Sequence, residues 1–365
     1  MLRDSYLIAG ERNILKITVN ILFIIHSWGQ ATTVINNTLF IHGGKKDSTY
    51  SYSSAPNIAE LLSLDLSSSF PLSSPPWTLL NTTNSPSVAF HTLTPYSGNQ
   101  FLLFGGDPGP GVALSTQNDS AAILDLATGG TGTWTVPTDG WATEPMRRQY
   151  HSATSCNSQV VIVGGEKVDG SDYGFTESYL FSPNPSFSLL NGNPPSDFVG
   201  HAALTLPNGT LLVFGGYSHI SHSLLSLKEL YTLDIASGTW GVVETAAEPT
   251  ATPPTTTTPE STPTEAPPSS ETWPATNTSQ DTTPYDGDGI PTRRRNFAAV
   301  LVGDDQVLIH GGTDAGLQQA QSDAFILNLS SCQWKELPTL GQALGYRWGH
   351  TAVASGNSVL FAFGQ

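Results

Sequence analysis

The chain has 365 residues, of which only 12% are charged, together with 35 Gly and 26 Pro. This composition favours short strands joined by turns over long helices, and the length indicates either two domains or one large repeat architecture. The formal net charge of -16 argues against nucleic acid as a partner, because phosphate binding needs clustered Lys and Arg, and the only basic run is Arg293–Arg295.

The N-terminal segment, residues 1–25, has two interpretations. Its apolar run, residues 17–25, follows Arg12 and Lys16 and resembles the core of a signal peptide. The run is too short to span a membrane. Alternatively, residues 5–9 and 13–19 are two strands that supply the missing third and fourth strands of the last sheet in the repeat described next.

From residue 26 onward, an apolar run ending in glycine recurs along the chain. Its spacing is near 50 residues once a low-complexity insert of about 45 residues is set aside, and this period is expected for propeller blades. Five copies end in Gly-Gly, and a degenerate sixth ends the chain at Gly364. The five glycine pairs are Gly43 and Gly44, Gly105 and Gly106, Gly164 and Gly165, Gly215 and Gly216, and Gly311 and Gly312.

Each period predicts four strands in the same order. A first apolar run, such as residues 201–206, precedes a tight turn of the Asn208–Gly209 kind, and the strand ending in Gly-Gly follows. A third run then ends near an acidic or amide residue. The fourth run carries a tryptophan in four copies, at Trp77, Trp134, Trp240 and Trp334, whereas the third copy has Phe187 there.

Gly-Gly after an apolar strand, an Asp-bearing third strand and Trp in the fourth resemble the kelch repeat. The resemblance covers nearly all of the chain outside the insert and the first 25 residues. Within the kelch proteins the chain is similar to fungal-type secreted or cell-surface members. It implies an all-β fold, a kelch-type β-propeller of about six four-stranded blades. Blades 1–4 then occupy residues 26–244, and blades 5 and 6, the sixth incomplete, occupy residues 291–365.

The two halves of the propeller are separated by residues 245–290, a Thr/Pro-rich segment. Such sequence cannot bury a core, so we expect disordered, mucin-like chain, an unmodified linker being the alternative. Together with six Asn-x-Ser/Thr sequons it favours a glycoprotein that is secreted or at the cell surface, with any membrane anchor lying only beyond residue 365. The sequons are at Asn36, Asn81, Asn118, Asn208, Asn277 and Asn328.

Histidine recurs at one place in the first strand, at His91, His151, His201 and His350, and Arg148, Arg294 and Arg347 recur three residues before this place. Four histidines around one axis could form a metal site. A residue repeated once per blade is more often a hydrogen-bonding element, so we predict a structural role and no metal site. Cys156 and Cys332 form either a disulfide or two thiols, and they are too few for a zinc site.

The sequence contains no nucleophile elbow, phosphate loop or His-Glu-x-x-His motif. We therefore predict a non-catalytic interaction module without a cofactor. It would bind a protein or glycan through loops that follow each Gly-Gly, namely residues 45–56, 107–118, 166–175 and 217–226. Since the kelch propeller also resembles the core of galactose oxidase, the alternative is a carbohydrate-active oxidase or hydrolase of that type.

Overall fold

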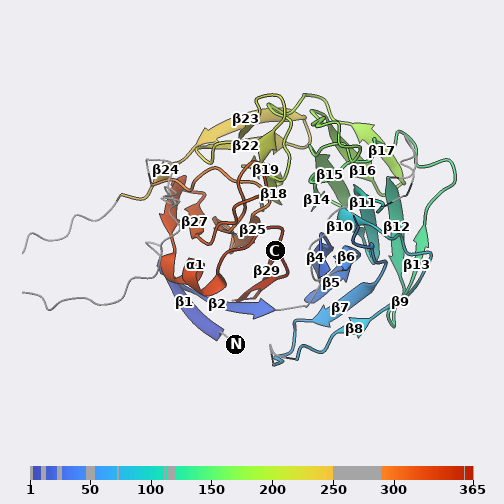
Figure 1. Cartoon of the computed structure of the whole chain (residues 1–365), viewed down its shortest axis with the longest axis horizontal. Helices are drawn as coiled ribbons and strands as arrows, with labels where there is room; N and C mark the ends of the chain where they lie inside the picture. The colour runs from blue at the N-terminus through green and yellow to red at the C-terminus, as the bar shows by residue number, and fades with distance from the viewer. Residues whose placement is uncertain are drawn as a thin grey trace, which may run out of the picture.

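The computed structural model describes residues 3–9, 14–22, 27–46, 54–71, 74–110, 112, 120–249, 289–356 and 358–364, with side chains from Trp28 onward. Almost every element is a strand, and the one helix of the described chain is α1 (Pro338–Leu344). The sheets are arranged as a ring, so the predicted all-β propeller is confirmed (Figure 1). None of the helical structure in these residues is long and apolar enough to cross a membrane.

Six sheets of four or five strands form the blades. Blade 1 holds β4 (Ala31–Ile35), β5 (Thr38–His42), β7 (Leu61–Asp65) and β8 (Thr78–Leu79). Blade 2 holds β10 (Ala89–Ser97), β11 (Gln100–Asp107), β12 (Ala121–Leu126), β13 (Thr131–Thr135) and β9 (Asn81–Thr83). Blade 3 holds β14 (Ser152–Cys156), β15 (Gln159–Val163), β16 (Ser178–Ser182) and β17 (Ser186–Leu189).

The remaining blades follow the same order. Blade 4 holds β18 (Ala202–Thr205), β19 (Thr210–Phe214), β22 (Glu229–Asp234) and β23 (Thr239–Glu244). Blade 5 holds β25 (Ala298–Val302), β26 (Gln306–His310), β27 (Ala324–Asn328), β28 (Gln333–Glu336) and β24 (Ala246–Ala247). Blade 6 holds β29 (Thr351–Ser355), β30 (Ser358–Ala362), β2 (Ile14–Leu22) and β1 (Arg3–Ala9). Two short ribbons pair β3 (Ser27–Trp28) with β6 (Lys45–Lys46) and β20 (Tyr217–Ser218) with β21 (Ser223–Leu224).

The first strand of each blade is the innermost, and these strands contact one another in chain order from β4 to β29. The ring closes where β29 contacts β4. At this junction the hydroxyl groups of Thr32 and Thr351 are 2.7 Å apart and hydrogen-bonded. The closure therefore joins the first blade to the last without involving the insert.

Blade 6 combines strands from both ends of the described chain. β30 pairs with β2 in parallel, and β2 pairs with β1 antiparallel. β2 therefore takes the third place in this sheet and β1 the fourth. The choice between a signal segment and ring-closing strands for residues 1–25 stays a prediction.

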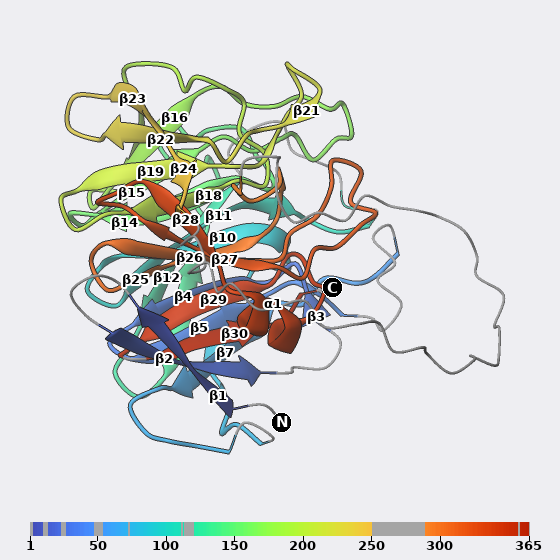
Figure 2. The same ribbon diagram turned by 90° about the vertical axis from the view of Figure 1, so that its left-hand side faces the viewer.

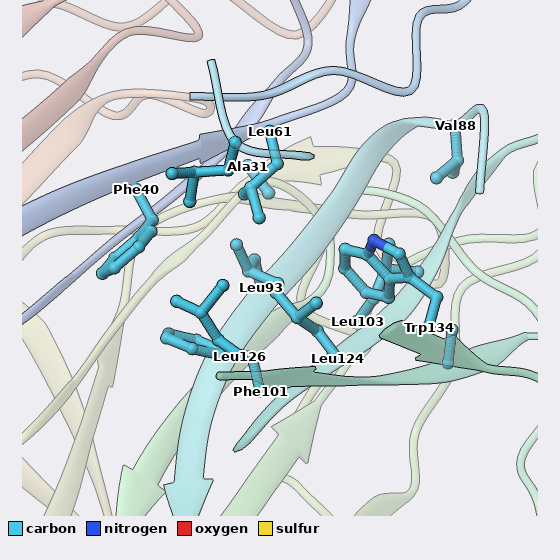
Figure 3. Packing of buried hydrophobic residues seen from close by; sticks show 12 residues of the cluster. Ala31, Phe40, Leu61, Val88, Leu93, Phe101, Leu103, Leu124, Leu126 and Trp134 are labelled. Carbon is cyan, nitrogen blue, oxygen red and sulfur yellow. The ribbon is translucent and has the colours of Figure 1, made fainter. Parts of the chain in front are cut away.

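The hydrophobic core is divided into six clusters, one at each seam between neighbouring blades. Figure 3 shows the cluster between blades 1 and 2, to which Trp134 of the fourth strand belongs together with Leu93, Phe101 and Phe40. Each seam but one receives an aromatic side chain from a fourth strand or the residue before it: Trp77, Trp134, Phe187, Trp240 and Trp334. In the seam between blades 5 and 6, Leu340 and Leu344 of α1 take part instead.

The chain leaving some blades adds a parallel strand to the outer edge of the next. β9 follows blade 1 and pairs with β13 of blade 2, while β24 follows blade 4 and pairs with β28 of blade 5. The predicted start of the insert at residue 245 is therefore too early. Thr245 is buried and accepts a hydrogen bond from the indole N–H of Trp334, which fixes this stretch to blade 5. Residues 250–288 of the predicted disordered insert lie outside the described residues.

The Gly-Gly pairs lie where two blades approach most closely. All ten glycines have positive φ, and in each pair the second glycine donates its N–H to a carbonyl at the start of the next blade. Gly106, for example, donates to the Arg148 carbonyl at 2.7 Å. A Cβ on Gly105 would lie 2.3 Å from that same carbonyl oxygen. In the sixth copy Phe363, at φ 65°, takes the first position and Gly364 the second, so the pair begins one residue earlier than the sequence alignment assumed.

Two glycine substitutions separate backbone strain from this close approach. Gly98, at a hairpin tip, also has positive φ, but nothing lies within 4 Å of the position of its Cβ. Gly98→Ala should therefore cost about 1–2 kcal/mol of unfolding free energy, and Gly105→Ala about 1–3 kcal/mol more because of the clash with blade 3. Urea denaturation measures both, and equal losses would contradict the role of Gly105 at the seam.

Candidate functional site

A ring of six residues in left-handed conformation surrounds the central axis at the start of the first strands. Gly29, Phe90, Tyr150, Gly200, Asn296 and Gly349 all have φ between 54° and 69°. Backbone hydrogen bonds join neighbouring members, such as the N–H of Asn296 to the Gly200 carbonyl at 2.7 Å. Three of the six are not glycine, and left-handed backbone is costly for side chains such as Phe90. A backbone hydrogen bond to or from a neighbouring member helps to hold each of the three in this conformation.

This ring surrounds a cavity of about 200 Å³ at the mouth of the central channel. Its lining is largely aromatic, with Trp28, Phe90, Tyr150 and Trp348 among the contributing residues. Trp28 packs edge-on against Phe90, and Phe90 lies 5.1 Å from Tyr150 between ring centroids. The mouth thus presents packed aromatic rings in a fixed backbone frame.

The recurring histidines point from this level into the seams. His151 and His201 bond through Nε2 to the hydroxyls of Thr92 and Ser152 in the preceding blade, at 3.0 and 2.8 Å. The other two, His91 and His350, each bond through Nε2 to a histidine, His42 and His310 respectively, at 2.9 Å. Each repeated histidine therefore joins two neighbouring blades.

The residue that bonds to each repeated histidine depends on which side chains the preceding blade places in the seam. A hydroxyl follows the repeated position in blades 2 and 3, whereas blades 1 and 5 have Ala31 and Ala298 there, and in these blades the second strand supplies a histidine. Blade 4 has Ala202 and Phe214, and the next blade carries Phe297 in place of histidine, 5.7 Å from Phe214 between centroids. A histidine thus occupies the repeated position where the preceding blade supplies a hydrogen-bonding side chain, and phenylalanine occupies it where the preceding blade supplies only apolar side chains.

Burial keeps these histidines neutral. Desolvation lowers the pKa of four of them to about 3, and it lowers the pKa of His91 and His350 well below the ordinary value, with repulsion from a neighbouring histidine adding to it. The four are His42, His151, His201 and His310. Within the described ranges no three His, Cys, Asp or Glu side chains gather to hold a metal ion.

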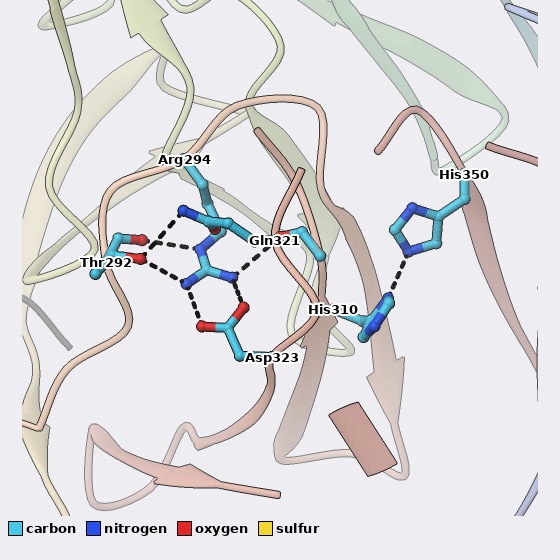
Figure 4. A network of polar contacts seen from close by, with 7 residues as sticks. Thr292, Arg294, His310, Gln321, Asp323 and His350 are labelled. Carbon is cyan, nitrogen blue, oxygen red and sulfur yellow. Dashed lines mark hydrogen bonds and ion pairs between the residues drawn. The ribbon is translucent and has the colours of Figure 1, made fainter. Parts of the chain in front are cut away.

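The recurring arginines brace the Gly-Gly turns. Arg294 donates to the Gly311 carbonyl at 3.0 Å and forms a two-pronged pair with Asp323, at 2.6 and 2.8 Å (Figure 4). Arg148 repeats this arrangement with the Gly164 carbonyl and Glu177. Since Asp323 and Glu177 precede the third strands, each arginine links the second strand to the third.

The long loops after Gly-Gly lie on the same side of the ring as the channel mouth. The end of each second strand pairs with the start of a first strand, as Asp107 does with Ala89. Segments that follow second strands and segments that precede first strands therefore emerge together, and Figure 2 shows β3, β21 and α1 on this side. We call this side the Gly-Gly face.

Two carboxylates hold its loops in place. Asp197 is fully buried and accepts hydrogen bonds from the Ser218 hydroxyl and from the N–H groups of His219 and Ile220. Glu166 of blade 3 reaches across to blade 4, where its carboxylate lies 2.7 Å from Nε2 of His219. These contacts order the loops of blades 3 and 4 relative to each other.

Four of the nine exposed large hydrophobic side chains of the described chain lie on the Gly-Gly face. Val112, Tyr173 and Ile220 follow second strands, and Tyr346 precedes the first strand of blade 6, with exposed fractions from 51% to 74%. Four tyrosines stand in the predicted binding loops. Tyr173 and Tyr217 are on this face, whereas Tyr50 and Tyr52 lie outside the described residues.

The other predicted residues are placed as follows. Cys156, at the hairpin of blade 3, and Cys332, between β27 and β28, are both free. Asn36, Asn81 and Asn208 are exposed, and Asn328 is partly buried with its side-chain oxygen accepting the Ser331 N–H. Asn118 and Asn277 lie outside the described residues. Neither the left-handed ring nor the buried carboxylates had a signal in the sequence that we recognised.

Comparisons with known proteins agree with the fold. The Kelch motif family matches residues 294–341. Adagio protein 3 of Arabidopsis thaliana is 26% identical over 301 residues, which are 80% of this chain and 41% of that protein. Putative adagio-like protein 2 of Oryza sativa subsp. japonica is 26% identical over 304 residues, with the same shares.

A third relative, Acyl-CoA-binding domain-containing protein 4 of Arabidopsis thaliana, is 24% identical over 231 residues, which are 59% of this chain and 33% of that protein. The chain thus spans about two fifths of the length of the first two relatives. The motif, the relatives and the ring of blades together show a kelch-repeat propeller. The predicted similarity to fungal secreted proteins stays a prediction.

The buried histidines should make the protein sensitive to acid. Their folded pKa values lie below the unfolded value of 6.5, so the unfolded chain binds more protons as the pH falls from about 6.5 toward 3. The contribution of these histidines to the free energy of unfolding is therefore fully present above pH 6.5. Below pH 6.5 the free energy of unfolding should decrease by about 1.4 kcal/mol per pH unit for each such histidine. Urea unfolding measured between pH 7 and pH 4 gives this slope.

A double substitution that copies the residues of one seam into another tests this assignment. Thr92→Ala with His151→Phe gives the seam between blades 2 and 3 the apolar set found between blades 4 and 5, since Phe104 already stands where Phe214 does. The slope should decrease by about 1.4 kcal/mol per pH unit. His222→Gln, at an exposed side chain, is the control and should leave it unchanged. An unaltered slope in the graft would refute the assignment to His151.

Proposed function

We propose that this chain is a non-catalytic propeller that binds a protein partner through its Gly-Gly face. The kelch repeat and the similarity to Adagio proteins support an interaction module. No observation favours the oxidase or hydrolase alternative, and the two cysteines are free and belong to different blades.

The observation that carries the proposal is that exposed apolar side chains stand on loops of the Gly-Gly face that buried hydrogen bonds hold in place. Ile220 is 70% exposed although Asp197 fixes the backbone on which it stands. Tyr173 is 51% exposed beside Gly174, whose close approach to Asp197 leaves no room for a side chain. Apolar groups presented on an ordered frame lose little conformational entropy on binding, which favours association with a protein surface.

The size of the channel mouth supports the same conclusion. Sites for whole small molecules usually measure about 300–1,000 Å³, and the cavity here holds about 200 Å³. A cavity of this size suits one side chain of a larger partner. A glycan ligand is the alternative, and the two are separated by whether binding survives enzymatic removal of sugars from the partner.

We further propose that the protein is secreted or at the cell surface. The support comes from the sequence, in which six sequons accompany the Thr/Pro-rich segment. Three of the sequon asparagines are exposed, so glycosylating enzymes can reach them.

Substitutions on the Gly-Gly face should weaken partner binding without loss of stability. Tyr173→Ser with Ile220→Ser removes two exposed apolar groups, and we expect binding of partners recovered in a two-hybrid library screen to weaken at least about ten-fold. The melting temperature should stay within a degree or two because both side chains are already exposed. Binding constants come from surface plasmon resonance.

The matched control uses apolar residues of similar exposure on the outer strands. Leu189 and Val242 are 58% and 57% exposed, on β17 and β23. Leu189→Ser with Val242→Ser should leave binding unchanged. If the control variant loses affinity as much as the face variant, or if neither does, the Gly-Gly face is not the binding surface.

Exposure also predicts which sequons carry glycans. On expression through a eukaryotic secretory route, Asn36, Asn81 and Asn208 should be modified, whereas Asn328, partly buried and bonded to Ser331, should not. Mass spectrometry before and after peptide N-glycosidase treatment reads each site separately. An unmodified chain that is nevertheless secreted would contradict the proposal of a glycoprotein.

A further inference from the structure

Four cationic side chains are buried in the described part of the chain, and they differ in whether an acidic side chain neutralises their charge. Lys45 pairs with Asp107 at 2.9 Å, Arg148 with Glu177 at 3.3 Å, and Arg294 with Asp323 at 2.6 Å. Arg295 is only 5% exposed, yet within the described residues its side chain makes no ion pair and no hydrogen bond. Burying a charge without a partner is costly, so this exception needs a reason.

Two aromatic rings offset part of the cost of burying the Arg295 charge. Its guanidinium carbon lies 5.4 Å from the ring centre of Tyr150 and 5.5 Å from that of Tyr217. Its Nε is fully enclosed and has no hydrogen-bond partner. Cation–π contacts offset part of the desolvation cost, but they leave the donors of the guanidinium unused.

The carboxylates of the surrounding loops are engaged elsewhere. Glu166 bonds to His219 and Gln149, and Asp197 bonds to the loop of blade 4. Asp314 follows Thr313, the residue that pairs with Arg295 through the backbone, and accepts hydrogen bonds from the N–H groups of residues 318 and 319. These three acids are therefore engaged elsewhere, and among the buried cations of the described residues Arg295 is the one without an acid.

Arg295 also lies beside the channel mouth. It precedes Asn296 and contacts Tyr150, which both line the cavity of about 200 Å³. We propose that Arg295 anchors the carboxylate of an aspartate or glutamate side chain that a protein partner inserts at this mouth. The inference rests on the proposed function, because it names the chemistry of the partner that the Gly-Gly face would bind.

A carboxylate fits this site better than a phosphate group. A phosphate carries nearly two negative charges and is usually held by several cations. Of the other three buried cations, Lys45, Arg148 and Arg294, each already has an acid. One guanidinium between two tyrosine rings matches a single negative charge, as the pairing of Arg294 with the one carboxylate of Asp323 illustrates elsewhere in this chain.

The test uses peptides selected from a phage-displayed library of random dodecapeptides on the immobilised chain. Each binder and its counterpart with Asp→Asn or Glu→Gln are then titrated by fluorescence anisotropy. Neutralising one acidic residue should weaken binding to the wild-type chain on the order of ten- to hundred-fold. The same change should have little effect on Arg295→Gln, because the charge it would pair with is gone.

Two further variants keep the result interpretable. Arg293→Gln removes the same charge from an exposed position two residues away and should behave as the wild type. Arg295→Lys keeps the cation where Arg295→Gln fails to fold, and it should retain part of the dependence on the acidic residue. Thermal unfolding of every variant separates a binding effect from loss of structure.

The outcomes distinguish this inference from the function on which it rests. If binders lose affinity for Tyr173→Ser with Ile220→Ser but show no dependence on acidic residues, or show it equally in Arg295→Gln, the carboxylate anchor is wrong and the binding face stands. If binders ignore both sets of substitutions, or if no binders are recovered, the proposed function fails and the anchor with it.

Discussion

The structure depends on how closely neighbouring blades approach at their Gly-Gly turns. There the N–H of one blade reaches a carbonyl at the start of the next, and the space between them leaves no room for a Cβ, as at Gly105 beside the Arg148 carbonyl. This contact sets the spacing of the first strands. The spacing in turn allows left-handed residues of neighbouring blades to form hydrogen bonds near the axis, and these residues line the channel mouth.

The seams must reconcile this close approach with buried polar groups. Each histidine that enters a seam finds a hydroxyl or a second histidine, and where blade 4 offers only Ala202 and Phe214, blade 5 presents Phe297 instead. A buried donor without an acceptor costs about 1–3 kcal/mol, so these positions are coupled across blades. The residue at the repeated position therefore differs between blades of this chain together with the residue that it contacts in the preceding blade.

Much of the fold could be predicted from the sequence because its strongest signals are local. Gly-Gly after an apolar run, the Asn208–Gly209 turn and tryptophans at a fixed place each reflect one short element. They lie in the strands or turns expected, except that Trp77 stands one residue before β8. What was missed depends on contacts between blades. Phe90 and Tyr150 adopt left-handed backbone where neighbouring blades bond to them, and nothing in their residue types indicates it. The start of the insert was misplaced because Thr245 is fixed by Trp334, 89 residues away.

The same division explains why function was hardest to derive. A repeat shows what its copies share, whereas a binding site is made of the positions where they differ. Residues equivalent to Arg295 include Trp28, Gln149 and Trp348, so one ring of positions combines aromatic, amide and charged groups. The frame that holds these residues is common to all blades, but only blade 5 places an unpaired cation there. Specificity arises from such differences, since a partner must match the ring as a whole, and a net charge of -16 disfavours acidic surfaces that do not reach that cation.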